Sequence, residues 1–159
     1  MNSAHNKQAL FFPSGSLQCE AYLFTPANSE SPAKATIILG QGFGCLWQFG
    51  CNNAIQSYTE AGYAVYAFNY RGFGESEGEP RQFINPHAQL EDWLAAIAFV
   101  KAHSDLPKPI VLWGSSFSGG HVISAAAATN GIDAVLAQVP HCDSRSAFKH
   151  VGLKKVCRV

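Results

Sequence analysis

The chain has 159 residues, of which 47% are hydrophobic and 14% are charged. This size and composition favour a single globular domain over residues 1–159 and exclude a disordered chain. Eleven basic and eleven acidic residues give a net charge of zero, so a nucleic-acid-binding surface is not expected. The sequence shows neither an apolar stretch of about 18 residues nor a signal-peptide pattern, so we expect a cytoplasmic protein without a membrane span.

The five cysteines predict free, mostly buried thiols in a reducing compartment. Their number is odd and none forms a Cys-x-x-Cys pair, which argues against a zinc site and a thioredoxin-like motif. We therefore expect no metal and no cofactor, and functional cysteine chemistry is the alternative. The five are Cys19, Cys45, Cys51, Cys142 and Cys157.

The N-terminal part predicts an antiparallel hairpin. Apolar runs at residues 8–12 and 17–24 flank the turn-forming residues 13–16. Four later runs are almost continuously apolar, which is typical of parallel strands that are buried on both faces. These runs span residues 35–39, 64–68, 109–113 and 134–139.

Three helical patterns lie between these strands. Residues 50–62 predict a polar helix that ends at Gly62, and about 118–128 predict a helix rich in Gly, Ala and Ser. Between them, Asn85 and Pro86 read as an N-cap and a first helical residue. The apolar face of this second helix is formed by Leu90, Trp93, Leu94, Ile97 and Val100. Alternating strands and helices predict an α/β fold with parallel strands and right-handed crossovers.

A serine lies at the junction of strand 109–113 and the third helix. The segment reads WGSSFSGG, in which Gly114-x-Ser116-x-Ser118 is a small-x-Ser-x-small motif. In such a tight turn the serine takes a strained backbone conformation, and only small residues fit two positions away. Ser116 is therefore the candidate nucleophile, with a plain glycine- and serine-rich turn as the alternative. Gly119 and Gly120 are expected to let the helix approach the sheet.

A glycine-rich loop at residues 40–44 follows strand 35–39. Acyl transfer needs two backbone N–H groups aimed at the developing oxyanion. We expect one from Phe117, directly after the serine, and the other from Phe43 in this loop. A plain turn or a phosphate-binding loop are the alternatives, but the glycine spacing does not match a dinucleotide-binding motif.

A third segment, NYRGFGESEGEPR at residues 69–81, follows strand 64–68. The glycine loop, this segment and the serine turn occur in the same order as in the α/β-hydrolase superfamily. Over roughly residues 8–143 the chain resembles that superfamily. The likeness is greatest to bacterial dienelactone hydrolases, serine aminopeptidases and acyl esterases. The resemblance implies an antiparallel hairpin followed by parallel strands, with helices on both faces. It also implies hydrolysis of a small ester, thioester or amide through an acyl-enzyme on Ser116, with Phe43 and Phe117 as oxyanion donors.

The sequence departs from the superfamily in two places. Gln41 stands where many members have a histidine in the glycine loop. We count about six strands, so the last two strands of the fold are missing, and the acid and histidine of the catalytic triad cannot be assigned. His121, on the third helix, is expected to point away from the serine or into the sheet interface. The missing triad residues have formal substitutes. These are His141 alone, or His150 paired with Asp133 or Asp143.

The remaining histidines, His5, His87 and His103, are interpreted as ordinary surface residues. The basic tail at residues 144–159 predicts a solvated helix face, with a membrane-surface or partner contact as the alternative.

Two hypotheses for function follow. The first is a serine hydrolase, catalytically incomplete as written because a serine hydroxyl needs a general base. The second is an inactive remnant that binds a ligand or partner through the same crevice. Under either, strand 134–139 is expected to be an uncovered edge through which the chain self-associates.

Overall fold

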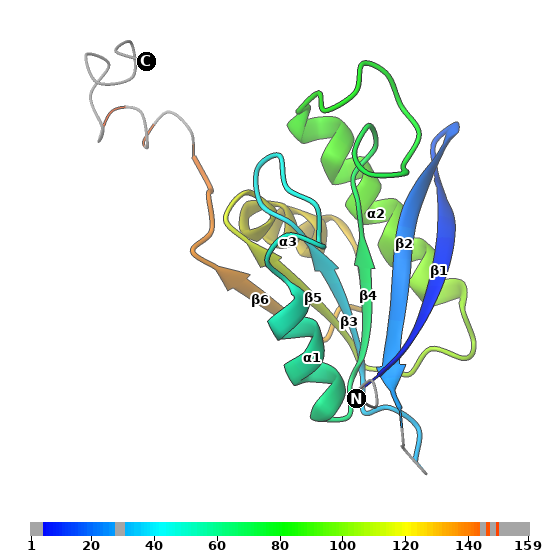
Figure 1. Ribbon diagram of the computed structural model, residues 1–159. Coiled ribbons are helices and arrows are strands. Elements are labelled where there is room, and N and C mark those ends of the chain that lie inside the picture. The colour runs from blue at the N-terminus through cyan, green and yellow to red at the C-terminus, as the bar shows by residue number, and fades with distance from the viewer. Residues whose placement is uncertain (1–4, 28–30, 144–145, 147–148, 150–159) are drawn as a thin grey trace.

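The structure, a computed structural model, describes residues 5–27, 31–143, 146 and 149. It contains six strands and three helices within these residues (Figure 1). In chain order they are β1 (His5–Ser14), β2 (Leu17–Pro26), β3 (Thr36–Gly40), α1 (Asn52–Glu60), β4 (Ala64–Phe68), α2 (Pro86–Ala102), β5 (Ile110–Ser115), α3 (Phe117–Ala128) and β6 (Ala134–Gln138).

The strands form one sheet in the order β1-β2-β4-β3-β5-β6. β2 pairs antiparallel with both β1 and β4, whereas β3, β4, β5 and β6 run parallel. The predicted hairpin followed by parallel strands is confirmed. The carboxyl ends of the parallel strands therefore share one edge of the sheet, where α/β folds place their sites.

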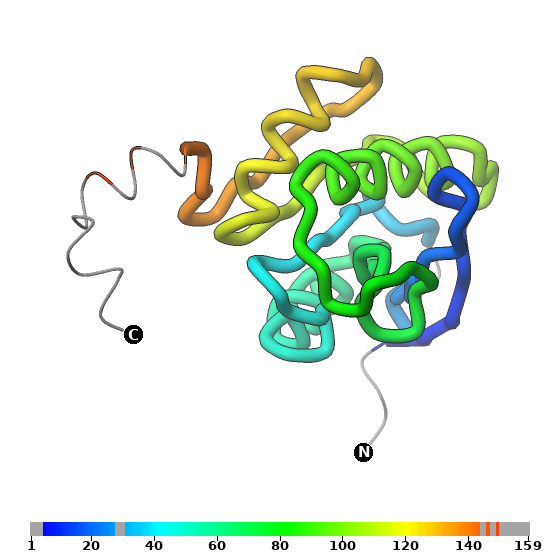
Figure 2. The backbone as a smooth tube through the Cα atoms, turned by 90° about the horizontal axis from the view of Figure 1, so that it is seen from above, coloured from blue at the N-terminus to red at the C-terminus, as the bar shows by residue number. Residues whose placement is uncertain are grey.

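The helices cover both faces of the sheet, as the resemblance implied (Figure 2). On one face, α2 and α3 pack through Trp93, Ile97 and Val122 against strand residues that include Ile38 and Tyr66. On the other face, α1 packs Ile55 into a second cluster with Leu39 and Val65. The central strands β3 and β4 are buried along their whole length, which explains their almost uninterrupted apolar sequences.

The hairpin turn is tighter than predicted. Pro13 and Ser14 belong to β1, and only Gly15 and Ser16 form the turn. Pro13 is tolerated because β1 is an edge strand, where a missing N–H does not interrupt a ladder on both sides. Gly15 has a φ of 61°, the left-handed conformation that a two-residue hairpin turn requires.

The helix boundaries follow the predicted signals closely. The side chain of Asn85 accepts hydrogen bonds from the N–H groups of His87 (3.1 Å) and Ala88 (3.2 Å), which confirms the N-cap of α2. The first helix is shorter than the predicted 50–62, and it ends at Glu60, before Gly62 turns the chain with a φ of 88°.

Of the two expectations for residues 134–139, the edge position is confirmed within the described residues, whereas burial on both faces is wrong. The run has the apolar character of a central strand, yet Ala137 is the only residue of β6 that is even half-buried. The reason is topological, because β6 pairs with β5 alone among the described residues.

None of the described helices is both long enough and apolar enough to cross a bilayer.

Candidate active site

Ser116 occupies the turn between β5 and α3, with a φ of 55° and a ψ of −112°. A positive φ is uncommon for a residue with a side chain and marks a position held by its surroundings. Gly114 shows how tight the turn is, since a Cβ there would lie 2.3 Å from the carbonyl oxygen of Ser118. The predicted position and strained backbone of Ser116 are thus present.

Two backbone hydrogen bonds hold Ser116, one to the last residue of β6 and one from the segment that follows β6. The Ser116 N–H donates to the Gln138 carbonyl at 2.9 Å, and the His141 N–H donates to the Ser116 carbonyl at 2.8 Å. A Cβ at Gly120 would lie 2.3 Å from the His141 carbonyl oxygen. The expectation for Gly119 and Gly120 therefore holds only in part. A Cβ at Gly119 would lie 3.3 Å from the carbonyl oxygen of Gln138 in β6, but the nearest contacts of both glycines are with the segment that follows β6.

The glycine-rich loop lies against this serine. A Cβ built at Gly42 would be 3.4 Å from Ser116 Cβ and 3.9 Å from its Oγ. The rings of Phe43 and Phe117 meet edge to face, with centroids 5.5 Å apart. Phe117 is also the first residue of α3, where helical N–H groups lack partners within the helix. The fold thus brings both predicted oxyanion residues beside Ser116.

A cavity of about 550 Å³ opens at this point, at the carboxyl edge of the sheet. Its lining includes the aromatic residues Phe43, Phe49 and Trp113 and also Ser116 and Gln138. None of the described residues that line it is charged. Such a cavity suits an uncharged group with a few hydrogen-bonding atoms.

Gln41, at the position of the superfamily's histidine, fastens the loop to α1. Its side chain is buried, and its Oε1 accepts a hydrogen bond from the Cys51 thiol at 2.9 Å. Burial raises the pKa of Cys51, so the thiol stays protonated at neutral pH and acts as the donor. Cys51 is also the N-cap residue of α1.

His121 is buried between α3 and the start of α2, and not in the sheet interface as one expectation had it. Its Nε2 lies 3.2 Å from the Pro86 carbonyl oxygen, and its Nδ1 lies 3.3 Å from the Tyr70 hydroxyl. Burial lowers the pKa of His121, so the neutral imidazole is favoured. Both ring nitrogens therefore already face a protein group.

The other formal triad substitutes lie at different places. The His141 ring packs on Phe117, with centroids 5.9 Å apart, in a separate cavity of about 390 Å³. Asp133 Oδ2 accepts a hydrogen bond from the Ile110 N–H at 2.8 Å, at the start of β5. Since Ser116 follows the other end of β5, a strand length of about 20 Å separates them. Asp143 follows β6, and His150 lies outside the described residues, as does most of the basic tail.

The surface assignment of three histidines is correct only for His87, which is exposed. His5 begins β1, is half-buried and packs edge to face on Phe24 at 5.1 Å. The ring of His103 packs on Phe99, with centroids 4.4 Å apart. Both histidines sit next to aromatic residues in their own or a neighbouring element, and this proximity buries them.

The four described cysteines have free thiols, but only Cys19 and Cys51 are buried, whereas Cys45 and Cys142 are exposed. The expectation of mostly buried thiols is therefore half right, and Cys157 lies outside the described residues. Burial raises the pKa of Cys19 to about 12, which makes this thiol unreactive.

One buried ion pair was not anticipated from the sequence. Asp92 of α2 is fully buried and accepts hydrogen bonds from Arg71 Nε at 2.8 Å, the Arg71 N–H at 3.0 Å and Ser14 Oγ at 2.6 Å. These contacts fix the 69–81 turn to α2. The available signal was an aspartate next to Trp93 on the apolar face of the helix.

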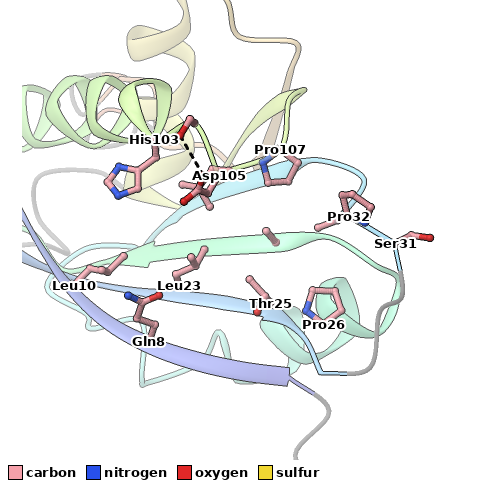
Figure 3. A pocket seen from close by; sticks show the side chains of 14 residues that line it. Gln8, Leu10, Leu23, Thr25, Pro26, Ser31, Pro32, His103, Asp105 and Pro107 are labelled. Carbon is pink, nitrogen blue, oxygen red and sulfur yellow. Dashed lines mark hydrogen bonds between the residues drawn. The ribbon is translucent and has the colours of Figure 1, made fainter.

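A second cavity of about 550 Å³ lies at the opposite, amino-terminal edge of the parallel strands (Figure 3). It is lined by Leu10 and Leu23 of the hairpin and by the segment around His103, where Ser104 donates a hydrogen bond to Asp105 at 3.2 Å. It contains none of the predicted site residues.

Solved structures share this fold. A hypothetical protein of Pseudomonas aeruginosa, PA2218, superposes with a TM-score of 0.77 at 25% identity, covering 84% of this chain and 42% of its own. Est1E of Butyrivibrio proteoclasticus, solved with ferulic acid bound, gives a TM-score of 0.75 at 25% identity, with 84% and 53% covered. An esterase of Pyrococcus furiosus gives 0.81 at 16% identity, covering 98% and 57%, which shows the fold alone.

Curated relatives point the same way. The quorum-quenching protein AidA of Acinetobacter baumannii (strain MDR-ZJ06) is 39% identical over 137 residues, which is 86% of this chain and 44% of AidA. The thiohydrolase aneE of Aspergillus aculeatus (strain ATCC 16872 / CBS 172.66 / WB 5094) is 31% identical over 105 residues, 65% of this chain and 33% of its own. The chain thus spans less than half the length of these relatives. The family model of the serine aminopeptidases, S33, matches residues 31–157. The chain belongs to this family of α/β-hydrolases.

Proposed function

We propose that Ser116 is the nucleophile of a hydrolase that cleaves small esters, thioesters or amides through an acyl-enzyme. The observation that carries the proposal is the strained Ser116, with its φ of 55°, set between β5 and α3 under the 40–44 loop and open to a cavity. A backbone outlier of this kind, held by surrounding contacts, is typical of functional positions. Family membership supports the reaction class.

In the proposed reaction, Ser116 Oγ attacks the carbonyl carbon of the substrate and a tetrahedral intermediate forms. The N–H groups of Phe117 and Phe43 donate to its oxyanion. The position of Phe117 at the N-terminus of α3 adds the favourable helix dipole. Loss of one such donor typically lowers kcat by about 10²–10³. The intermediate then collapses to the acyl-enzyme and expels the alcohol, thiol or amine, which takes up the proton that Ser116 lost. Water then attacks the acyl-enzyme, which releases the acid and returns the proton to Ser116.

The attack also requires a group that takes the serine proton. His121 is poorly suited, because its two ring nitrogens face Pro86 and Tyr70 and its pKa is lowered. The His141 ring lies in a cavity that does not include Ser116. We therefore propose that the chain as written turns over slowly.

The cavity beside Ser116 supports a neutral acyl group. Its aromatic wall of Phe43, Phe49 and Trp113 can bury an apolar chain or ring, and its described lining offers no charged partner for a free amine or carboxylate. Esters and thioesters of uncharged acids fit better than peptides with a charged N-terminus. The relative aneE is a thiohydrolase, which agrees with this class.

The proposal is tested with p-nitrophenyl acetate, p-nitrophenyl butyrate and a butyryl thioester. We expect slow hydrolysis, well below an ordinary enzyme's kcat of about 10 s⁻¹, that Ser116→Ala abolishes. The control Ser104→Ala, at the far edge of the sheet, should keep the wild-type rate. Equal rates in wild type and Ser116→Ala would contradict the proposal. Saturable ligand binding without such hydrolysis would favour the alternative, an inactive binding module.

A further inference from the structure

Ser118 stands where the small-x-Ser-x-small motif most often has glycine, and its hydroxyl makes specific contacts. The residue is fully buried in the first turn of α3. Its Oγ donates a hydrogen bond to the Gln41 carbonyl oxygen in the 40–44 loop. The same Oγ is hydrogen-bonded to the hydroxyl of Tyr70, a residue that follows β4. One side chain thus joins the serine turn, the glycine loop and the 69–81 turn.

The direction of these hydrogen bonds is fixed by the groups that can only donate or only accept. The Trp93 indole N–H can only donate, and it does so to the Tyr70 oxygen at 2.7 Å. The Gln41 carbonyl can only accept, so the Ser118 proton points to it. Ser118 Oγ therefore accepts from the Tyr70 O–H. Burial raises the pKa of Tyr70, which keeps this phenol protonated as a donor.

The chain of hydrogen bonds accordingly runs from Trp93 to Tyr70, to Ser118 and on to Gln41. Its members are all at least nine-tenths buried, so water does not compete for these groups. Hydrogen bonds connected in series strengthen one another at low dielectric. The result is a rigid connection from α2, through the serine turn, to the glycine loop.

The Gln41 carbonyl and the Gly42 N–H belong to one peptide group, and this group is planar. A hydrogen bond that holds the carbonyl therefore also holds the orientation of the Gly42 N–H and of the backbone that continues to Phe43. Gly42 in turn lies against Ser116, as the 3.4 Å separation between the built Cβ and Ser116 Cβ shows. A small rotation of this peptide would move the Phe43 N–H relative to Ser116.

We infer that Ser118 is a positioning residue, which holds the 40–44 loop in the orientation that aims its N–H groups at the oxyanion. This inference rests on the proposed function of Ser116. Alanine at position 118 removes the hydroxyl with little change in volume, and Tyr70→Phe removes the donor that orients it. Ser118→Gly, the residue the motif more often carries, offers a second way to remove the hydroxyl.

The test has two readouts on the full chain. The first is the amide chemical shifts of Gly42 and Phe43 by NMR, which report the orientation of the loop whether or not the protein is active. In Ser118→Ala and Ser118→Gly we expect the Gly42 and Phe43 amide resonances to shift more than those of residues that do not contact position 118, with a smaller shift in Tyr70→Phe. The control is Ser124→Ala, which removes an exposed serine of the same helix whose hydroxyl donates to the Gly120 carbonyl at 3.2 Å. Its Gly42 and Phe43 resonances should match those of wild type.

The second readout is Ser116-dependent hydrolysis of p-nitrophenyl butyrate. Removing the Ser118 hydroxyl should lower kcat about 10- to 100-fold, as expected for a misplaced oxyanion donor, and leave KM within about twofold. Unchanged Gly42 and Phe43 amide resonances, or resonances that shift equally throughout the chain, would overturn the inference. If wild type shows no Ser116-dependent hydrolysis, the proposed function fails, and the chemical-shift measurement still decides the role of Ser118.

Discussion

Asp92 illustrates at the scale of one residue how a buried charge organises this fold. Its carboxylate is completely buried, and Arg71 contacts it through both the side chain and the backbone. The same guanidinium also pairs with Glu91 at 3.0 Å, but the Glu91 side chain is 67% exposed. The two neighbouring acids thus share one partner and differ in burial.

We predict that Asp92→Ala lowers the free energy of unfolding by about 3–5 kcal/mol, because it leaves Arg71 and Ser14 without their buried acceptor. Glu91→Ala is the matched control and should cost at most about 1 kcal/mol, as exposed pairs do. Urea unfolding of the three proteins measures the difference. Similar losses for both variants would contradict this interpretation.

Local spacing was enough to predict that Ser116, Phe43 and Phe117 lie just after strands, because each follows a strand signal in the sequence. It was not enough for Asp92 or for the contact of Ser118 with Gln41. Their partners are 21 and 77 residues away in the chain. Which distant segments meet depends on strand order, and no short motif carries that information.

At the scale of elements, the junction of β5 and α3 depends on the absence of a side chain at Gly114. A Cβ there would lie 2.3 Å from the Ser118 carbonyl oxygen, a backbone atom that cannot move without distorting the helix. Gly42→Ala offers a matched comparison, since its Cβ would meet Ser116 Cβ at an ordinary 3.4 Å.

We therefore expect Gly114→Ala to destabilise the protein by more than about 3 kcal/mol or to prevent folding, as overpacking against a rigid neighbour does. Gly42→Ala should change the melting temperature only slightly. Thermal unfolding followed by circular dichroism distinguishes them. A Gly114→Ala protein with the wild-type melting temperature would show that the turn is looser than described.

Elements were predictable because their signals are local, as with the N-cap of α2 and the apolar runs of β3 and β4. The apolar run of β6 did not by itself predict its exposure, because such a run reads the same at the centre or at the edge of a sheet. The edge position was predicted from the count of six strands, and β6 has one neighbour among the described strands.

At the scale of the whole molecule, β6 and the residue after it have apolar side chains and a strand edge that no other described residue covers. Val135, Leu136 and Val139 are 37%, 46% and 76% exposed. Strand edges of this kind pair readily with another chain. We predict that the isolated chain self-associates through this edge.

The test is sedimentation velocity over a range of protein concentrations. The wild-type chain should form larger species as concentration rises, and Leu136→Lys should shift it towards monomer because a charge on an edge strand disfavours pairing. Phe83→Lys is the control, because Phe83 is also exposed (59%) but lies in the segment between β4 and α2 and not in β6. A wild-type chain that stays monomeric at every concentration would contradict the prediction.

We propose that the fold holds Ser116 as a nucleophile beside the 40–44 loop. Covalent labelling with a fluorophosphonate, followed by peptide mass spectrometry, tests this role directly, because the probe marks the reactive residue even when turnover is slow. We expect one adduct, on the peptide that contains Ser116, which is lost in Ser116→Ala and kept in Ser104→Ala. Labelling at another residue, or equal labelling of the Ser116→Ala chain, would contradict it.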